Sequence, residues 1–102
     1  MSNELQQLQD WFRSQCDGDW EHGNGIKLET LDNPGWSLDV ALEDTHLEDT
    51  PFEKVWVERS DSDWLYAVVE DRVFRGRGGA GNLAEVLRTF IDWAQKGAHR
   101  GA

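Results

Sequence analysis

The sequence predicts an α+β domain in which two helices pack, in two layers, against a four-stranded antiparallel meander. Three observations support this prediction. Apolar residues recur at helical spacing near both ends of the chain, and they alternate with polar residues through the middle. Clusters of Asp, Asn, Gly and Pro separate these segments. Because neither helix can bury its apolar stripe alone, both are expected to pack on the sheet.

The first helix is predicted over residues 3–16. Apolar side chains follow helical spacing from Leu5 to Phe12, and the residues between them are Gln, Asp and Arg. The Asp17-Gly18-Asp19 cluster that follows is typical of a turn, so the helix is expected to end there. This amphipathic pattern predicts that one face of the helix packs on the sheet.

Two strands, residues 26–31 and 36–42, are predicted to form a hairpin. Each alternates apolar and polar residues, and Asn33-Pro34-Gly35 between them suits a tight turn of odd length. Matching the two apolar faces places Leu28 opposite Val40. The polar segment 43–51 then serves as a connection, because it ends in proline and has no apolar period.

A second hairpin is predicted over residues 52–59 and 64–70, in a register that places Val55 opposite Val69. Both faces of these strands are apolar. One face carries Val55, Val57, Leu65, Ala67 and Val69, and the other carries Phe52, Trp56, Trp64, Tyr66 and Val68. Two alternatives stay open for the aromatic face. Either the first helix and the 43–51 connection cover it, or it is exposed and binds a protein.

The last element has the clearest ends. Asn82 is a good N-cap, Glu85 follows at the spacing of a capping box, and Gly97 suits the position after a helix. The residues between them make a broad apolar stripe. A chain of 102 residues fits one domain, so we expect a single unit over residues 1–97 and a flexible tail at 98–102.

The charge of the chain restricts its partners. The net charge is −10, and residues 1–71 contain 18 Asp or Glu against 4 Lys or Arg. A surface this acidic repels phosphate, which argues against nucleic acids and anionic membranes and favours a basic protein partner. The single cysteine excludes an internal disulfide. The first residues do not have the pattern of a signal peptide, and no stretch reaches about 20 apolar residues, so a cytoplasmic location is expected.

Residues 16–22 (Cys-Asp-Gly-Asp-Trp-Glu-His) suggest an active site at first sight. A thiol–imidazole pair of Cys16 and His22 is one hypothesis, but the neighbouring carboxylates would raise the pKa of the thiol. A metal site at Asp17, Asp19, Glu21 and His22 is another, but a calcium loop needs a glycine and a final Glu that are missing. The favoured prediction is a cysteine packed at a helix end and a turn whose carboxylates cap backbone N–H groups, with no metal and no cofactor.

Residues 76–81 (Gly-Arg-Gly-Gly-Ala-Gly) match the dinucleotide fingerprint G-x-G-x-x-G. That motif requires a following parallel strand and an acidic residue about 20 positions on, and this chain has neither. A flexible turn is therefore expected, with residues 72–75 extending the sheet or crossing its edge. Arg75 and Arg77 leave a weaker hypothesis of anion binding at the following helix.

Residues 16–22, together with residues 25–36 (Gly-Ile-Lys-Leu-Glu-Thr-Leu-Asp-Asn-Pro-Gly-Trp), resemble the immunity protein 53 family of bacterial polymorphic-toxin systems. The final helix, with Phe90-x-x-Trp93-Ala94, is similar to that family too. The resemblance covers most of the chain and is strongest over residues 11–42. It departs at Asn24, where the family commonly has an aromatic residue before Gly-Ile.

The resemblance implies a cytoplasmic protein without enzymatic activity, encoded beside a toxin, that protects the producing cell by binding the toxin. It is expected to be a monomer or a weak homodimer paired through strand edges or the aromatic face. The alternative is a small sulfurtransferase-like enzyme or a metal-binding protein that uses residues 16–22. The hypothetical toxin contacts are Asp17, Asp19, Glu21, Glu43, Asp44, Glu48, Asp49, Trp56, Asp61, Asp63 and Tyr66.

Overall fold

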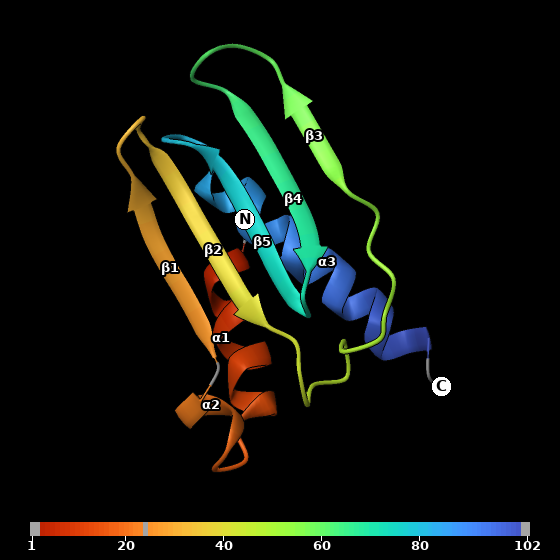
Figure 1. The fold of residues 1–102 in the computed structure, drawn as a ribbon. Helices are drawn as coiled ribbons and strands as arrows, with labels where there is room; N and C mark the ends of the chain where they lie inside the picture. The colour runs from red at the N-terminus through yellow and green to blue at the C-terminus, as the bar shows by residue number, and fades with distance from the viewer. Residues whose placement is uncertain (1–2, 24, 101–102) are drawn as a thin grey trace.

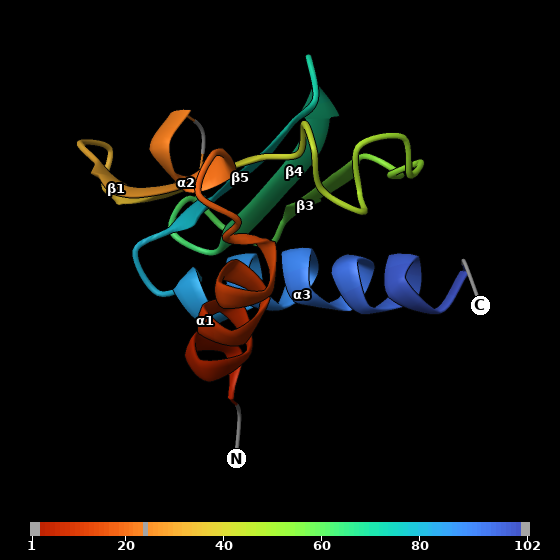
Figure 2. The ribbon, with the colours of Figure 1, turned by 90° about the horizontal axis from the view of Figure 1, so that it is seen from below.

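A computed structural model describes residues 3–23 and 25–100, and it confirms an α+β fold with one antiparallel sheet flanked by N-terminal and C-terminal helices. The elements are α1 (Glu4–Gln15), α2 (Trp20–Gly23), β1 (Ile26–Leu31), β2 (Gly35–Ala41), β3 (Val55–Glu58), β4 (Trp64–Glu70), β5 (Val73–Gly79) and α3 (Leu83–Arg100). Helices α1 and α3 lie on the same side of the sheet (Figures 1 and 2). Within the described ranges, no helix is long and apolar enough to cross a membrane.

The sheet has five strands, so the predicted four-stranded meander is wrong. The spatial order is β1-β2-β5-β4-β3, and all neighbours are antiparallel. The connection after β2 carries the chain to the far edge of the sheet, where β3 begins, and β5 then returns between β2 and β4 (Figure 1). The last strand in the chain thus becomes the central strand of the sheet.

The central strand β5 contains most of the glycine-rich segment that was expected to be a flexible turn. Gly76 and Gly78 face α3, and a Cβ atom on either would lie 2.9 or 2.8 Å from a methyl group of Val86. Glycine at these positions lets the helix approach the strand closely. The core-facing positions of this strand are Phe74, Gly76 and Gly78. The expectation of a turn was wrong because two of these three positions are glycines, which are typical of turns and conceal the alternation of a strand.

Both hairpins form, but their registers differ from the predicted ones by two residues. Leu28 lies opposite Leu38, and Val55 lies opposite Ala67. A shift of two residues keeps every side chain on its predicted face, because side chains alternate with a period of two. The first hairpin closes on a three-residue loop between Leu31 and Gly35, so the odd loop length was correct.

The C-terminal helix begins as predicted but ends later. Asn82 precedes α3, and its side-chain amide donates to the Glu85 carboxylate over 2.9 Å, so the two expected capping residues do interact. The helix does not stop before Gly97 but continues to Arg100. Of the residues expected to form a flexible tail, 101–102 lie outside the described part of the chain, as does Asn24.

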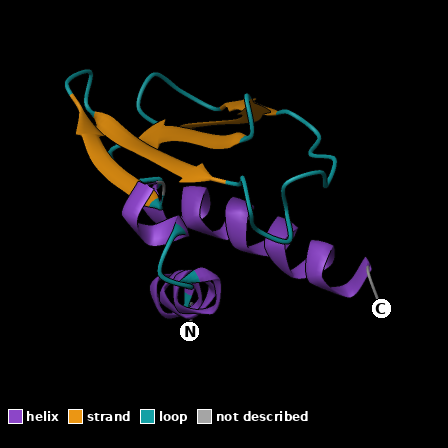
Figure 3. Cartoon of the chain, turned by 60° about the horizontal axis from the view of Figure 1, so that its bottom comes forward, coloured by secondary structure: helices purple, strands orange, loops and turns teal. Residues whose placement is uncertain are grey.

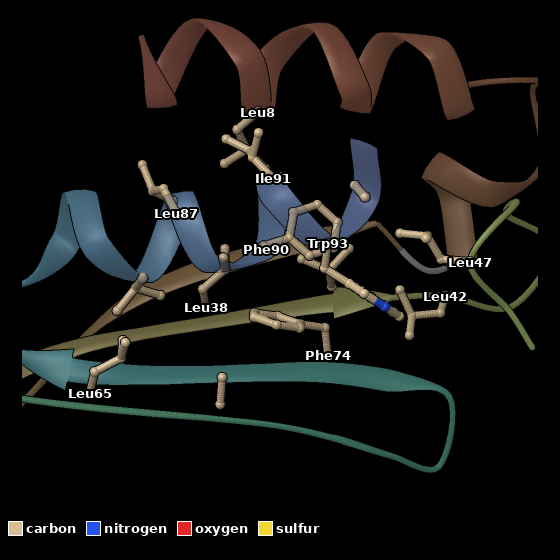
Figure 4. Packing of buried hydrophobic residues seen from close by; sticks show 14 residues of the cluster. Leu8, Leu38, Leu42, Leu47, Leu65, Phe74, Leu87, Phe90, Ile91 and Trp93 are labelled. Atoms are coloured by element: carbon tan, nitrogen blue, oxygen red, sulfur yellow. The ribbon is translucent and has the colours of Figure 1, made fainter. Parts of the chain in front are cut away.

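The core lies between the helices and the sheet (Figure 4). Phe74 of β5 packs at its centre, with its ring centroid 5.0 Å from that of Phe90 of α3. Phe52 also points into this core, because its ring lies 5.4 Å from Phe74 and 5.1 Å from Trp93. The expectation that Phe52 shares the aromatic face of the second hairpin was therefore wrong, and the reason is that β3 starts only at Val55.

Helix α1 packs mainly against α3 (Figure 3), so the expectation that both helices pack directly on the sheet was wrong for α1. Leu8 and Ile91 meet between the two helices (Figure 4). Glu4, which is 6% exposed, accepts a hydrogen bond from Nε of Arg88 over 2.9 Å. A buried carboxylate needs such a partner, and this pair fixes the N-terminal end of α1 against α3.

Candidate functional site

The segment between α1 and β1 folds into a turn capped by its own carboxylates. Asp17 Oδ1 accepts hydrogen bonds from the backbone N–H groups of Asp19 and Trp20, over 2.9 and 3.1 Å. Glu21 accepts from the N–H groups of Asp17 and Gly18, over 3.0 and 2.7 Å. These bonds confirm the predicted capping role and leave fewer free oxygens for a metal.

The same bonds hold both carboxylates in the ionised form. Hydrogen bonds from the Asp19 and Trp20 backbone lower the pKa of Asp17. The pKa of Glu21 is lowered by its own backbone N–H and by those of Asp17 and Gly18. Both side chains therefore stay charged at neutral pH and stabilise the turn.

Trp20 fastens this turn to the domain. Its side chain is 1% exposed, and its indole N–H donates to the Ala41 carbonyl at the end of β2 over 3.1 Å. Its ring meets that of Trp11 edge-on, with 5.8 Å between centroids, and lies 5.6 Å from Phe12. The aromatic residue in the middle of the acidic run is thus an anchor that holds α2 against α1 and β2.

Cys16 is exposed, so the prediction of a packed cysteine was wrong. Its thiol donates to the Phe12 carbonyl over 3.2 Å. Desolvation, followed by the charges of Glu21 and Asp17, raises the pKa of the Cys16 thiol, as the sequence predicted. Within residues 3–23 and 25–100, no group of three or more His, Cys, Asp or Glu side chains is placed to hold a metal.

Seven of the predicted contact residues gather at one end of the molecule, which we call the acidic end. It consists of the turn before β1 and the connection after β2, and its acids are Asp17, Asp19, Glu21, Glu43, Asp44, Glu48 and Asp49. Figure 1 shows both segments at the lower end of the sheet. A hydrogen bond of 2.8 Å from the Trp11 indole to His46 ties the connection to α1. Arg72 brings a positive charge to the acidic end, 3.4 Å from Glu48.

Trp56 and Tyr66 lie elsewhere, on the face of the sheet that points away from α1 and α3. They are direct cross-strand partners on β3 and β4, and their rings meet edge-on at 5.5 Å. Trp56 is 61% exposed. Lys54 Nζ lies 5.4 Å from the centre of the Tyr66 ring, a cation–π contact. The alternative in which the first helix covers this aromatic face is therefore wrong, and we call this surface the open face.

The open face also carries two arginines, neither of which is among the predicted contacts. Arg77 lies opposite Tyr66, and its guanidinium is 2.8 Å from Asp39 on β2. Arg75 lies 3.9 Å from Asp39 and 3.8 Å from Glu70. Because both arginines have carboxylate partners and point away from α3, the hypothesis of an anion site at the start of that helix loses its support.

One signal in the sequence could have found these arginines. Over residues 73–78, Arg75 and Arg77 alternate with Phe74, Gly76 and Gly78, which is the period of a strand. Glycines are also typical of turns, and this conceals the alternation. Recognising the strand would have placed two positive charges beside the aromatic pair.

Asp61 and Asp63 lie in the β3–β4 turn, at the opposite end of the sheet from the acidic end (Figure 1). Asp63 is held by two neighbours: it lies 3.0 Å from Arg59 and accepts a hydrogen bond of 2.9 Å from Asn82. These interactions lower the pKa of Asp63. They tie the turn to the start of α3. The structure thus distributes the eleven predicted contacts over three separate places.

A comparison with models of protein families matches residues 5–95 to immunity protein 53. Comparisons with curated proteins and with solved structures gave no match. The matched segment runs from α1 to the last turns of α3, so it includes the capped turn, the acidic end and the open face. The chain therefore belongs to the immunity protein 53 family.

Proposed function

We propose that this chain binds a cognate polymorphic toxin in the cytoplasm of the producing cell and neutralises it by occlusion. Membership of an immunity protein family implies a protein partner, a toxin, and suggests a role without catalysis. The proposed contact surface is the open face, centred on Trp56 and Tyr66. The acidic end is proposed to attract a basic toxin before contact.

The exposed aromatic pair carries this proposal. A tryptophan that is 61% exposed on a sheet face leaves a large apolar area in water. Burying the ring against a partner would remove this area from water, which is favourable. The edge-on contact with Tyr66 and the nearby Lys54 hold the ring in a defined position before binding. Tryptophan and tyrosine are enriched at the centres of interfaces, where truncation of a hot-spot residue costs about 2 kcal/mol or more.

The charges around this pair suit a polar rim. On β5, Arg75 and Arg77 form ion pairs with Asp39, so the open face presents mixed charges beside the aromatic rings. Most of the acids of the acidic end are exposed and have no basic neighbours in sequence. Such a concentration of negative charge speeds the approach of a basic partner over distances of about 10 Å, but adds little to the lifetime of the complex.

The proposal is tested with the toxin domain encoded beside the gene of this chain. Trp56→Ala is expected to weaken binding of that domain about 30-fold or more by calorimetry and to reduce protection of cells that express it. The matched control is Leu5→Ala, because Leu5 is 69% exposed but lies on α1, on the other side of the sheet. Equal affinities for Trp56→Ala and the unmodified chain would refute the proposed surface.

A further inference from the structure

The strand β1 forms an edge of the sheet that no described element covers. It has six residues, four of them exposed, whereas the opposite edge strand β3 has only four residues. The Gly25 carbonyl accepts from the Ala41 N–H over 3.0 Å, and hydrogen-bonded pairs alternate along an antiparallel ladder. The backbone hydrogen bonds to β2 are therefore made by residues 25, 27, 29 and 31. The N–H and C=O groups of Ile26, Leu28 and Thr30 point outward.

An apolar groove runs beside this edge on the helix side of the sheet. It has a volume of about 290 Å³ and is lined by Leu5, Leu8, Gln9, Phe12 and Ile26. Leu5 is 69% and Leu28 is 40% exposed. Free backbone groups beside exposed leucines form a template for strand pairing, which natural edge strands usually block with a charge or a proline. The backbone groups and side chains of β1 therefore determine which strand can pair with this edge.

We propose that β1 pairs with β1 of a second copy of this chain, in antiparallel register centred on Leu28. In this register Leu28 faces Leu28 of the second copy, and Ile26 faces Thr30, so all outward-pointing backbone groups meet in hydrogen-bonded pairs. Lys27 faces Glu29 of the second copy, and Glu29 faces Lys27. These two pairs occupy the non-hydrogen-bonded positions, where side chains approach most closely.

The neighbouring registers are disfavoured by charge. Moving the centre to residue 27 sets Lys27 against Lys27 of the second copy, and moving it to residue 29 sets Glu29 against Glu29. Like charges that face each other directly are destabilising. Lys27 would block pairing with an unrelated strand, and it faces an opposite charge only in the Leu28-centred register. The edge is thus self-complementary, as a two-fold symmetric interface requires.

The same symmetry brings the two apolar grooves together. A two-fold axis through Leu28 and normal to the sheet places both helix layers on the same side of the joined sheet. The groove of each copy, with its exposed Leu5, then lies beside the groove of the other across the axis. The open face stays uncovered in both copies, so pairing and toxin binding use different surfaces of the sheet.

The test is sedimentation velocity on the purified full chain from micromolar to millimolar concentration. The unmodified chain is expected to dimerise. Lys27→Glu and Glu29→Lys should each weaken dimerisation about tenfold, because two attractive pairs become repulsive. The double variant K27E/E29K should restore it to within about threefold, and so should an equal mixture of the two single variants, which are complementary to each other.

Lys96→Glu is the matched control, because it makes the same change in net charge as Lys27→Glu at an exposed position on α3. It should leave dimerisation unchanged, and circular dichroism should show that all variants are folded. Three results would overturn the proposal: a monomer at every concentration, no restoration in the double variant or the mixture, or an equal loss in Lys96→Glu. A monomer whose toxin binding is weakened by Lys27→Glu would instead assign this edge to the toxin.

Discussion

The acidic end and the open face differ in what holds their side chains in place. At the acidic end, carboxylates cap turns and project from connections, and the buried ring of Trp20 fastens the turn that carries three of them. On the open face, Trp56 and Tyr66 project from paired strands whose register fixes their positions. In the proposed function, the acidic end would supply charge for long-range attraction, and the open face would supply preorganised area for contact.

The largest expected effect is a loss of folding stability, and it tests which side chains hold each surface in place. Trp20→Ala should destabilise the domain by about 3–5 kcal/mol, because it removes a fully buried ring and its hydrogen bond to Ala41. Trp56→Ala should change stability by less than about 1 kcal/mol, because the side chain is mostly exposed. Urea denaturation of both variants measures the difference. Similar losses in the two would contradict the distinction between an anchor and a contact residue.

The next effect separates attraction from contact. Reversing the charges of Glu43, Asp44, Glu48 and Asp49 should slow association with the toxin domain about tenfold at low salt and flatten its salt dependence, with little change in dissociation. Trp56→Ala should do the opposite and mainly speed dissociation. Stopped-flow or surface-based kinetics at several salt concentrations measure both rates. Unchanged association rates after charge reversal would contradict the proposal that the acidic end attracts the toxin.

Acid should weaken the acidic end more than the open face. The folded-state pKa of Asp17 is lowered, so its contribution to stability is present above the unfolded pKa of about 4 and is lost as pH falls through the folded value. Asp17→Asn keeps an acceptor oxygen but does not titrate. Melting curves between pH 7 and 3 should show a smaller loss for Asp17→Asn than for the unmodified chain. An identical pH profile would contradict the capping role.

The smallest expected effect concerns Cys16. Its raised pKa keeps the thiol protonated at neutral pH, so alkylation at pH 7 should be no faster than that of a free cysteine. Cys16→Ser should leave protection against the toxin unchanged. A thiol that reacts rapidly at neutral pH, together with loss of protection in Cys16→Ser, would revive the enzyme alternative at residues 16–22.

Local signals were enough to predict α1, the start of α3, the two hairpins and the capped turn, but not the short helix α2. The turn at Asp17 and the start of α3 after Asn82 depend on side chains within three or four positions, so the sequence shows them directly. Hairpin faces follow from alternation, although each register was wrong by two residues. A shift of that size keeps every side chain on the same face, so the alternation alone does not select between the two registers.

The position of β5 at the centre of the sheet could not be predicted, because it depends on contacts with residues that are distant in the sequence. Gly76 and Gly78 are required by the close approach of Val86 on α3, a contact that appears only after the helix packs on the sheet. For the same reason the sequence could not divide the predicted contacts among three places. Asp63 and Asp17 are both turn acids, yet the fold sends them to opposite ends of the sheet.

We propose that the toxin contacts the open face. Hydroxyl-radical footprinting of the chain, alone and in complex with the toxin domain encoded beside its gene, tests this most directly, because it reports the solvent access of individual side chains. Oxidation of Trp56 and Tyr66 is expected to fall several-fold in the complex, while oxidation of Leu5, which is 69% exposed against 61% for Trp56, should not change. Undiminished oxidation of Trp56 in a saturated complex would contradict the claim.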